Sequence, residues 1–458
     1  MQCHNKDPLS IPPIRGDTPP RMRFSPKQYL PLILISGILL GVILLVLTRP
    51  EQPPAPTPTP PPTPPARPVL SMLAAPPDWS ALDVYQNTIR REDFERLLTT
   101  VFTTGDAWKS YIEIGNEEAR IQTGTFPTDP VFRLHFAERD ASPPRQWRTA
   151  SELPATHPEL PLAGLKIAID AGHIGGAWAK MEERWFVVGD GKPVQEGDMT
   201  LYVAMLLKPR LETLGAMVTL VRDSLEPVTT IRPEALLTLA QDSPSTESPQ
   251  KLAERLFYRT AEIRARADLV NQVIKPDLVL CLHFNAEGWG DPNTPTLIDR
   301  THLHLLLNGA YTDEEIKLAD QRFAMLQKLL QRTHQEEALV GATVADTFAE
   351  ISGLPPYVYP QESKSVRPVA GHPYLWARNL LANRLYDCPV IFMEPYVMNS
   401  TIDYPRIQAG DYEGLREIDG KMQPSIFRQY ADALAEGLRK HYSRALESRD
   451  ASKLPGQK

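Results

Sequence analysis

The chain has 458 residues, of which 42% are hydrophobic and 23% are charged, and its formal net charge is −7. This length allows one large domain or about three domains of roughly 150 residues each. The acidic balance argues against nucleic acid as a partner, because phosphate binding requires a basic face. Three cysteines (Cys3, Cys281 and Cys388) are too few and too widely spaced for a disulfide framework or a CxxC metal knuckle.

The first structural signal in the chain is an uncharged apolar run, LPLILISGILLGVILLVL, over residues 30–47. Its 18 residues are enough to span a bilayer as a helix. Basic residues gather in the preceding tail, 1–29, which predicts an N-terminus in the cytoplasm and everything after residue 48 on the outer side. No small-x-small cleavage site follows, so a retained single-pass anchor of the cytoplasmic membrane, 30–48, is favoured over a cleaved signal peptide.

The next segment, 49–77, is a proline-rich linker in which eleven of the nineteen residues from Pro50 to Pro68 are proline. Such a sequence favours polyproline II, with a reach of roughly 60 Å at about 3.1 Å per residue. Residues 78–140 then return to folded patterns: FERLLTTVF has helical spacing, whereas WKSYIEI and FRLHF alternate as strands do. We therefore predict a small α+β module of unassigned role, followed by a Pro/Ser/Thr-rich linker over 141–161.

From residue 162 to 445 apolar strands alternate with amphipathic helices, which predicts an α/β fold with a mostly parallel sheet flanked by helices. The predicted strands are LKIAID, MVTLVRD, DLVLCLHF, THLHLLL and PVIFME. A long amphipathic helix is expected over 313–334 and a closing helix from SIFRQY onward. Residues 446–458 complete the chain as a polar tail.

Four side chains with metal-site chemistry lie at the ends of these elements. His173, His283 and Glu394 each end an apolar strand, and Glu196 precedes a helix. Two imidazoles and one carboxylate are the ligands of a catalytic zinc whose fourth position stays open for water, and one carboxylate is left to transfer protons. Because ligands bind at the carboxyl ends of strands in an open α/β sheet, these residues predict metal-assisted hydrolysis of an amide.

Four segments in order resemble the zinc-dependent N-acetylmuramoyl-L-alanine amidases, which cut bacterial peptidoglycan: IAIDAGHIGGA, EGDMTLYVAMLLKPRLETLGAMVTLVRDS, RARADLVNQVIKPDLVLCLHFNAEG and PVIFMEPYVMNS. The resemblance covers most of residues 165–442. It implies that His173, Glu196 and His283 bind Zn²⁺ and that Glu394 is the catalytic base. It also implies peptidoglycan as the substrate, cut between the lactyl group of muramic acid and L-alanine, and a candidate protein activator as a partner.

Several alternatives stay open at this point. Glu182 and Glu183 are rival carboxylate ligands, because the stretch between His173 and Glu196 is longer than the family usually has. Asp170 either orients a ligand imidazole or is a turn residue at a strand end, and Asn285 either contacts substrate or serves a local turn. Arg378 either contacts an anionic substrate or, as is favoured, lies on a helix surface. The other histidines available as ligands are His302, His304, His334 and His372.

Two other functions compete with catalysis by an amidase. A noncatalytic homologue that binds peptidoglycan or regulates another hydrolase would lack a ligand or the base, and none is missing. A zinc carboxypeptidase acting on stem peptides would need a fixed arginine for the terminal carboxylate, and the sequence identifies none.

Overall fold

The computed structural model describes residues 69–154 and 159–453. These described residues all belong to one compact unit. The predicted tail 1–29, the anchor 30–48 and most of the linker 49–77 lie outside the described residues. Within the described ranges, no helix is long and apolar enough to cross a membrane.

The centre of this unit is a seven-stranded sheet with the order β10-β11-β9-β12-β8-β4-β7. Four neighbouring pairs are parallel, and the pairs β10–β11 and β9–β12 are antiparallel. The prediction of a mostly parallel sheet flanked by helices is thereby confirmed. The strands are β4 (Lys166–Ala171), β7 (Met217–Leu220), β8 (Leu278–Leu282), β9 (Leu303–Leu307), β10 (Val366–Pro368), β11 (Leu375–Arg378) and β12 (Val390–Pro395).

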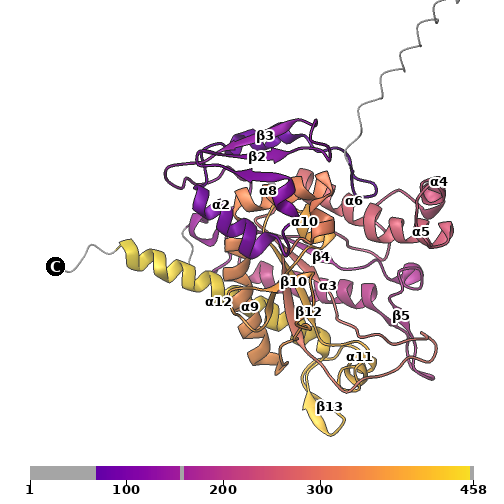
Figure 1. Cartoon of the computed structure of the whole chain (residues 1–458). Helices are drawn as coiled ribbons and strands as arrows, with labels where there is room; N and C mark the ends of the chain where they lie inside the picture. The colour runs from indigo at the N-terminus through magenta and orange to yellow at the C-terminus, as the bar shows by residue number, and fades with distance from the viewer. Residues whose placement is uncertain (1–68, 155–158, 454–458) are drawn as a thin grey trace, which may run out of the picture. The chain divides into compact units, whose positions relative to one another are not determined.

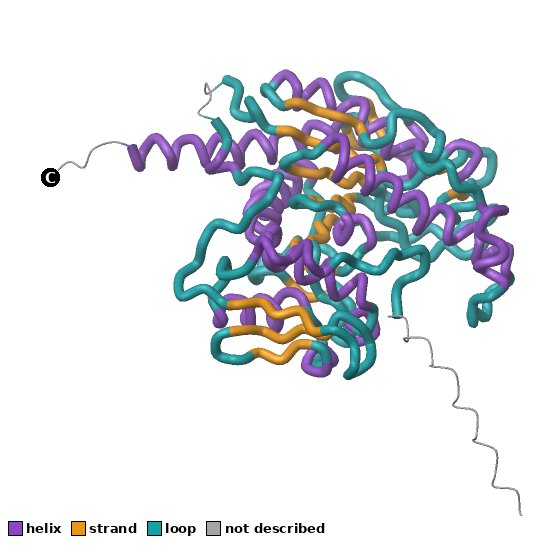
Figure 2. The backbone as a smooth tube through the Cα atoms, turned by 90° about the horizontal axis from the view of Figure 1, so that it is seen from above, coloured by secondary structure: helices purple, strands orange, loops and turns teal. Residues whose placement is uncertain are grey.

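Helices cover both faces of the sheet, as Figures 1 and 2 show. Successive residues of a strand point to opposite faces, so in β8 Leu280 joins the apolar cluster on one face and Cys281 the cluster on the other. The first face carries α3 (Glu196–Thr213), α9 (Thr333–Ser352) and α12 (Ile426–Lys453). The second carries α6 (Glu262–Asp268), its continuation η9 (Leu269–Ile274) and α10 (Leu381–Leu385).

Shorter elements complete the unit. They are η5 (Ala150–Glu152), η6 (Gly176–Trp178), β5 (Trp185–Phe186), β6 (Val194–Gln195), η7 (Pro233–Leu236), α4 (Leu237–Gln241), α5 (Pro249–Leu256), η8 (Phe257–Ala261), α7 (Asp313–Ile316), α8 (Ala319–Gln331), α11 (Tyr404–Ala409), β13 (Arg416–Ile418) and β14 (Lys421–Gln423).

The N-terminal region forms a small antiparallel sheet in the order β1-β2-β3 beside a helix. Its elements are η2 (Trp79–Tyr85), α2 (Arg91–Leu97), η3 (Leu98–Phe102), η4 (Ala107–Ser110), β1 (Ile112–Ile114), β2 (Glu118–Gln122) and β3 (Val131–His135). Its apolar residues share one buried cluster with Tyr311, Ile316, Met325, Leu326, Leu329 and Leu330. The region predicted as a module over 78–140 therefore packs on α7 and α8. Its strands β2 and β3 lie above α8 in Figure 1.

The prediction of one long helix over 313–334 is wrong. The structure divides this stretch into α7 and α8 and then starts α9, which runs on to Ser352. The backbone of Arg332 adopts a left-handed conformation, φ 59°, which no α-helix continues through. The apolar face of α8 packs against the N-terminal region, in the buried cluster that the two share.

Three further segments differ from their predicted form. Trp147, in the predicted linker 141–161, is 3% exposed and packs beneath the sheet with Ala168. Arg378 ends strand β11 and does not lie on a helix. Helix α12 continues to Lys453 and thus includes the first part of the predicted tail 446–458.

Candidate metal centre and active site

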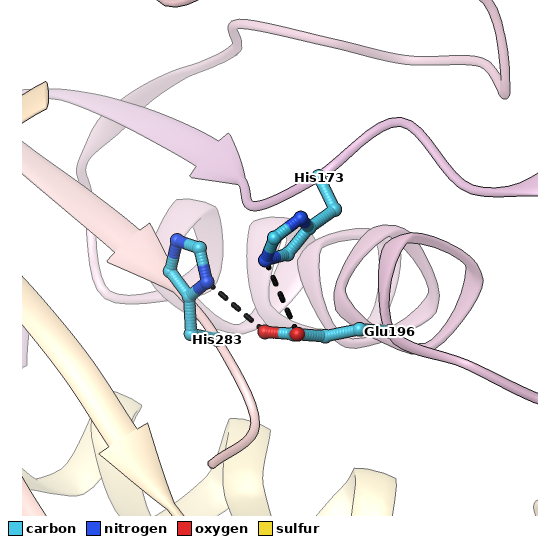
Figure 3. A group of neighbouring side chains, drawn as sticks. All are labelled: His173, Glu196 and His283. Carbon is cyan, nitrogen blue, oxygen red and sulfur yellow. Dashed lines mark hydrogen bonds and ion pairs between the residues drawn. The ribbon is translucent and has the colours of Figure 1, made fainter. Parts of the chain in front are cut away.

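His173, Glu196 and His283 meet at one edge of the sheet (Figure 3). His173 follows β4, His283 follows β8, and Glu196 is the first residue of α3. His173 Nε2 lies 3.1 Å from Glu196 Oε2, and His283 Nδ1 lies 3.0 Å from Glu196 Oε1. One ligand atom from each side chain lies within 4.8 Å of the other two. Among the described residues, this is the one group of three or more such side chains that could hold a metal ion.

Glycines allow these side chains to approach one another. A Cβ on Gly172 would lie 2.3 Å from Cε1 of the His283 ring, so only glycine fits there. A Cβ on Gly197 would lie 2.3 Å from the backbone nitrogen of Gly175, so the first turn of α3 also touches the His173 loop through glycine. His173 itself has φ 59°, a strained conformation for a residue with a side chain.

Two buried arginines hold the loop between β4 and α3, and neither was singled out as a functional residue from the sequence. Arg266 donates hydrogen bonds to the carbonyls of Ala171 and His173, both at 2.8 Å. Arg222 donates to the carbonyl of Gly197 at 2.8 Å. Arg266 lies in the quoted RARAD segment, but only the fold shows that it reaches the carbonyl of a residue 93 positions away.

Asp170 does not orient an imidazole, contrary to the first of its two interpretations. Its carboxylate accepts hydrogen bonds from Arg266 Nη1 at 2.8 Å and from the hydroxyl of Tyr386. The Arg266 guanidinium lowers the pKa of the Asp170 carboxyl against the opposing effect of burial. Asp170 therefore acts on His173 through Arg266. The ring of His283 is instead positioned by stacking on Phe392, with centroids 4.3 Å apart.

The electrostatics of the group favour a charged carboxylate between the rings. Burial acts to raise the pKa of Glu196, but the two imidazoles lower it well below its usual range. Burial acts to lower the pKa of His173, but the carboxylates of Glu196 and Glu182 raise it to about 9. Burial lowers the pKa of His283, which favours the neutral ring that a metal requires.

The rival carboxylates lie elsewhere. Glu182 accepts hydrogen bonds from the backbone N–H groups of Ile174 and Gly175, and it faces Nδ1 of His173 at 3.6 Å, away from Glu196. Such a carboxylate behind the ring fixes its orientation and leaves Nε2 free to bind a metal. Glu183 is an exposed residue of the cavity wall. The four rival histidines lie outside the group, with His302 and His304 on or next to β9, His334 near Phe102 and His372 paired with Asp346.

Glu394 lines the same cavity as the three residues and lies in β12, opposite His304 of β9. Burial and the neighbouring Glu196 carboxylate both raise its pKa. A carboxyl with a raised pKa can both accept and return a proton near neutral pH. Asn285, which follows β8 two residues after His283, serves a local turn, because its side-chain oxygen accepts the N–H of Ala286 at 2.6 Å.

The cavity in front of these residues has a volume of about 680 Å³. Its walls come mainly from the segment 284–293 and from the stretch between His173 and Glu196, including Lys180, Arg184 and Trp185. Arg184 Nε lies 3.2 Å from Glu196 Oε2 and adds a guanidinium to the two imidazoles that contact this carboxylate. The site therefore pairs a compact set of metal ligands with room for a substrate.

The donor set fits a zinc ion. Two imidazole nitrogens and a carboxylate converge from three different elements, and this combination leaves a fourth tetrahedral position open. Glu182 lies behind the His173 ring, as carboxylates do behind metal-binding histidines, and Arg266, which is paired with Asp170, holds the backbone carbonyl of His173.

Fold and site together define a candidate α/β metallohydrolase. No protein-family model matches the chain, and no curated protein matches it. Solved structures of N-acetylmuramoyl-L-alanine amidases are similar to it. They include Ami1 from Mycobacterium smegmatis (14% identity, TM-score 0.34, covering 62% of this chain and 99% of that one), Ami1 from Mycobacterium abscessus (16%, 0.35, 61% and 99%) and CwlD from Clostridioides difficile, solved in complex with the GerS lipoprotein (13%, 0.35, 61% and 100%). The side chains of the site, and not this distant likeness, carry the function proposed below.

Proposed function

We propose that this protein is a zinc-dependent hydrolase of an amide bond. One observation carries the proposal: ligand atoms of His173, Glu196 and His283 lie within 4.8 Å of one another, in a cavity that Glu394 also lines. A zinc ion held by these three side chains supplies Lewis-acid polarisation of the amide carbonyl and lowers the pKa of water.

The protein's own residues perform the remaining steps. Glu394, in its ionised form, accepts a proton from the attacking water and then donates it to the leaving amine. Its raised pKa suits both directions of transfer. His283 is held by stacking on Phe392, and His173 by Glu182 and Arg266, so that the ligand atoms keep their places during turnover.

The finer assignment is that the substrate is peptidoglycan, cut between N-acetylmuramic acid and L-alanine. The four sequence segments that resemble the amidases support it, and they include all four site residues. We further propose that the apolar run 30–48 anchors the protein in the cytoplasmic membrane, N-terminus inside, with the hydrolase on the outer side.

The test uses the full-length protein in detergent, with zinc content and release of peptide from purified peptidoglycan as readouts. We expect about one zinc per chain and release of peptides with a free L-alanine amine. Glu394→Gln should keep the zinc and lose activity by roughly 10²- to 10⁴-fold.

Glu183→Gln is the matched control, because it removes a carboxylate from the same cavity wall without touching the group. It should keep both zinc and activity. A wild-type protein that takes up no zinc would refute the metal centre. Zinc binding without release, with a candidate activator absent and then present, would favour the noncatalytic alternative.

A further inference from the structure

A second cavity, of about 560 Å³, borders the candidate metal centre. It shares His173 and His283 with the first cavity and no other lining residue. Most of its remaining wall comes from the segment 252–266, from 380–384 and from Ser71 and Met72, and Asp170, Gly172, Glu182, Gln321 and Phe392 complete it. The two imidazoles therefore border both cavities.

Arginines that lack a full set of partners line this second cavity. Arg384 is 7% exposed, and among the described residues the one hydrogen bond of its side chain goes to Asn379 Oδ1, at 2.6 Å, with no carboxylate paired to it. Arg264 has two buried nitrogens, Nε and Nη2, that make no hydrogen bond, and its nearest carboxylate oxygen, on Asp320, is 4.0 Å away. Arg259 is exposed and contacts Tyr258. Buried guanidinium groups are normally paired, so this arrangement calls for an anion.

The carboxylates of the same cavity cannot neutralise these arginines, because each is already engaged. Asp170 binds Arg266 and Tyr386. Glu262 binds Arg266 and the backbone N–H groups of Val228 and Thr229, and Glu182 binds the two backbone N–H groups behind His173. Of the other arginines in the wall, Arg255 is paired with Glu247. Among the described residues Arg259 and Arg384 are paired with no carboxylate and Arg264 has only the 4.0 Å contact with Asp320, so positive charge is in excess in this cavity.

The first cavity has the opposite character. Glu183, Glu196, Glu287 and Glu394 line it and outnumber its two basic side chains, Lys180 and Arg184, of which Arg184 is already paired with Glu196, so it suits a substrate carboxylate less well than the second cavity does. An anionic group of a substrate that straddles the metal centre is thus directed to the second cavity. A guanidinium presents a planar fork of N–H donors that matches a carboxylate in two hydrogen bonds.

We propose that the second cavity is a subsite for a carboxylate of the peptide part of the substrate. This inference rests on the proposed function, since it takes peptidoglycan peptides as the ligand. It assigns specificity to Arg259, Arg264 and Arg384, which lie on elements other than those that carry the metal group.

The experiment measures binding of a fluorescein-labelled peptide, L-Ala-γ-D-Glu-L-Lys-D-Ala-D-Ala, to zinc-loaded full-length protein by anisotropy. A second peptide carries both the glutamate α-carboxylate and the C-terminal carboxylate as amides. We expect the free carboxylate to bind at least about tenfold more tightly, since each arginine–carboxylate fork is a strong contact. Arg264→Gln should remove most of this preference and Arg259→Gln part of it.

Arg120→Gln is the control, because it removes an exposed arginine of β2 that is only loosely paired with Glu113. It should leave both affinities unchanged. Arg259 is exposed, so its variant tests the subsite even if Arg264→Gln fails to fold. Equal binding of the two peptides, or preference unchanged in the arginine variants, would overturn the subsite. Displacement of the peptide by inorganic phosphate at lower concentration than by acetate would overturn the carboxylate assignment.

The outcome is separable from that of the hydrolase proposal. Peptide release with no carboxylate preference leaves the hydrolase standing and removes the subsite. A carboxylate preference in protein that binds zinc but releases nothing keeps the binding site and removes the catalytic function.

Discussion

The edge of the central sheet, where the candidate metal centre lies, and the apolar cluster beneath the N-terminal region bury different kinds of side chain. The cluster consists of close-packed apolar side chains, with Phe94, Phe102 and Leu326 all 0% exposed. The sheet edge instead gathers a buried carboxylate, two imidazoles and a strained backbone at His173. The comparison teaches that the cluster serves stability and the edge serves chemistry, since strain and buried charge persist only where the surrounding structure supports them.

Gly172→Ala should produce the largest change at the edge. The added methyl would lie 2.3 Å from the His283 ring and push it out of line with Glu196. We expect zinc affinity to fall by more than about 100-fold, the upper range for changes around metal ligands. The affinity is measured by letting the protein compete with a chelator for zinc. Gly288→Ala, at a position with no atom within 4 Å of the added methyl, is the control. Unchanged zinc affinity in Gly172→Ala would mean that the ring has room to move.

Phe102→Ala tests the cluster. It should lower the free energy of unfolding by about 3–5 kcal/mol through the cavity it leaves, as measured by urea denaturation. Zinc bound per folded molecule should stay the same, because Phe102 contacts no residue of the edge. Loss of zinc from folded variant protein would break the division between the two regions.

Asp170→Asn tests a residue that acts on the candidate metal centre indirectly, through Arg266. The change removes the charge that Arg266 faces, and Arg266 holds the carbonyl of His173. We expect zinc affinity to drop by about 10- to 100-fold. Isothermal titration with zinc measures the change, and Asp277→Asn, which weakens the remote pair with Arg148, serves as its comparison. Equal effects of the two variants would show that the loss is one of general stability.

His334→Leu should change only the pH dependence of stability and leave the metal group as it is. Burial lowers the pKa of His334 to about 4, whereas the unfolded chain holds it near 6.5. The unfolded state thus binds more protons between these values, and stability falls as the pH drops through this window. Between pH 7 and pH 5 the wild type should lose about 2 kcal/mol more than the variant. Urea denaturation at the two pH values measures this difference. Equal losses of unfolding free energy in the wild type and the variant would show that His334 does not titrate as expected.

Much of the sheet could be predicted from the sequence, because its buried strands are short apolar runs and its helices show helical spacing. The ends of those runs also pointed to His173, His283 and Glu394. Glu196 could be preferred to Glu182 because the amphipathic helix begins directly at it, as in the family that the sequence resembles. The contact between Gly175 and Gly197, which brings this helix against the His173 loop, is contained in no local pattern. The shared cluster with α8 was missed for a similar reason: it joins residues more than 200 positions apart, and the sequence carries no signal for that pairing.

The direction of β9 has a consequence for how this protein can diversify. Because β9 runs antiparallel to β12, its first residue, Leu303, lies at the edge where His283 ends β8. The chain between His283 and Leu303 does not have to return to the opposite end of the strands. Its length of about twenty residues is therefore free to form a single loop over the first cavity. Exchanging this loop alters what the cavity admits while the sheet and the metal ligands stay as they are, which makes it the natural place to graft new substrate preferences.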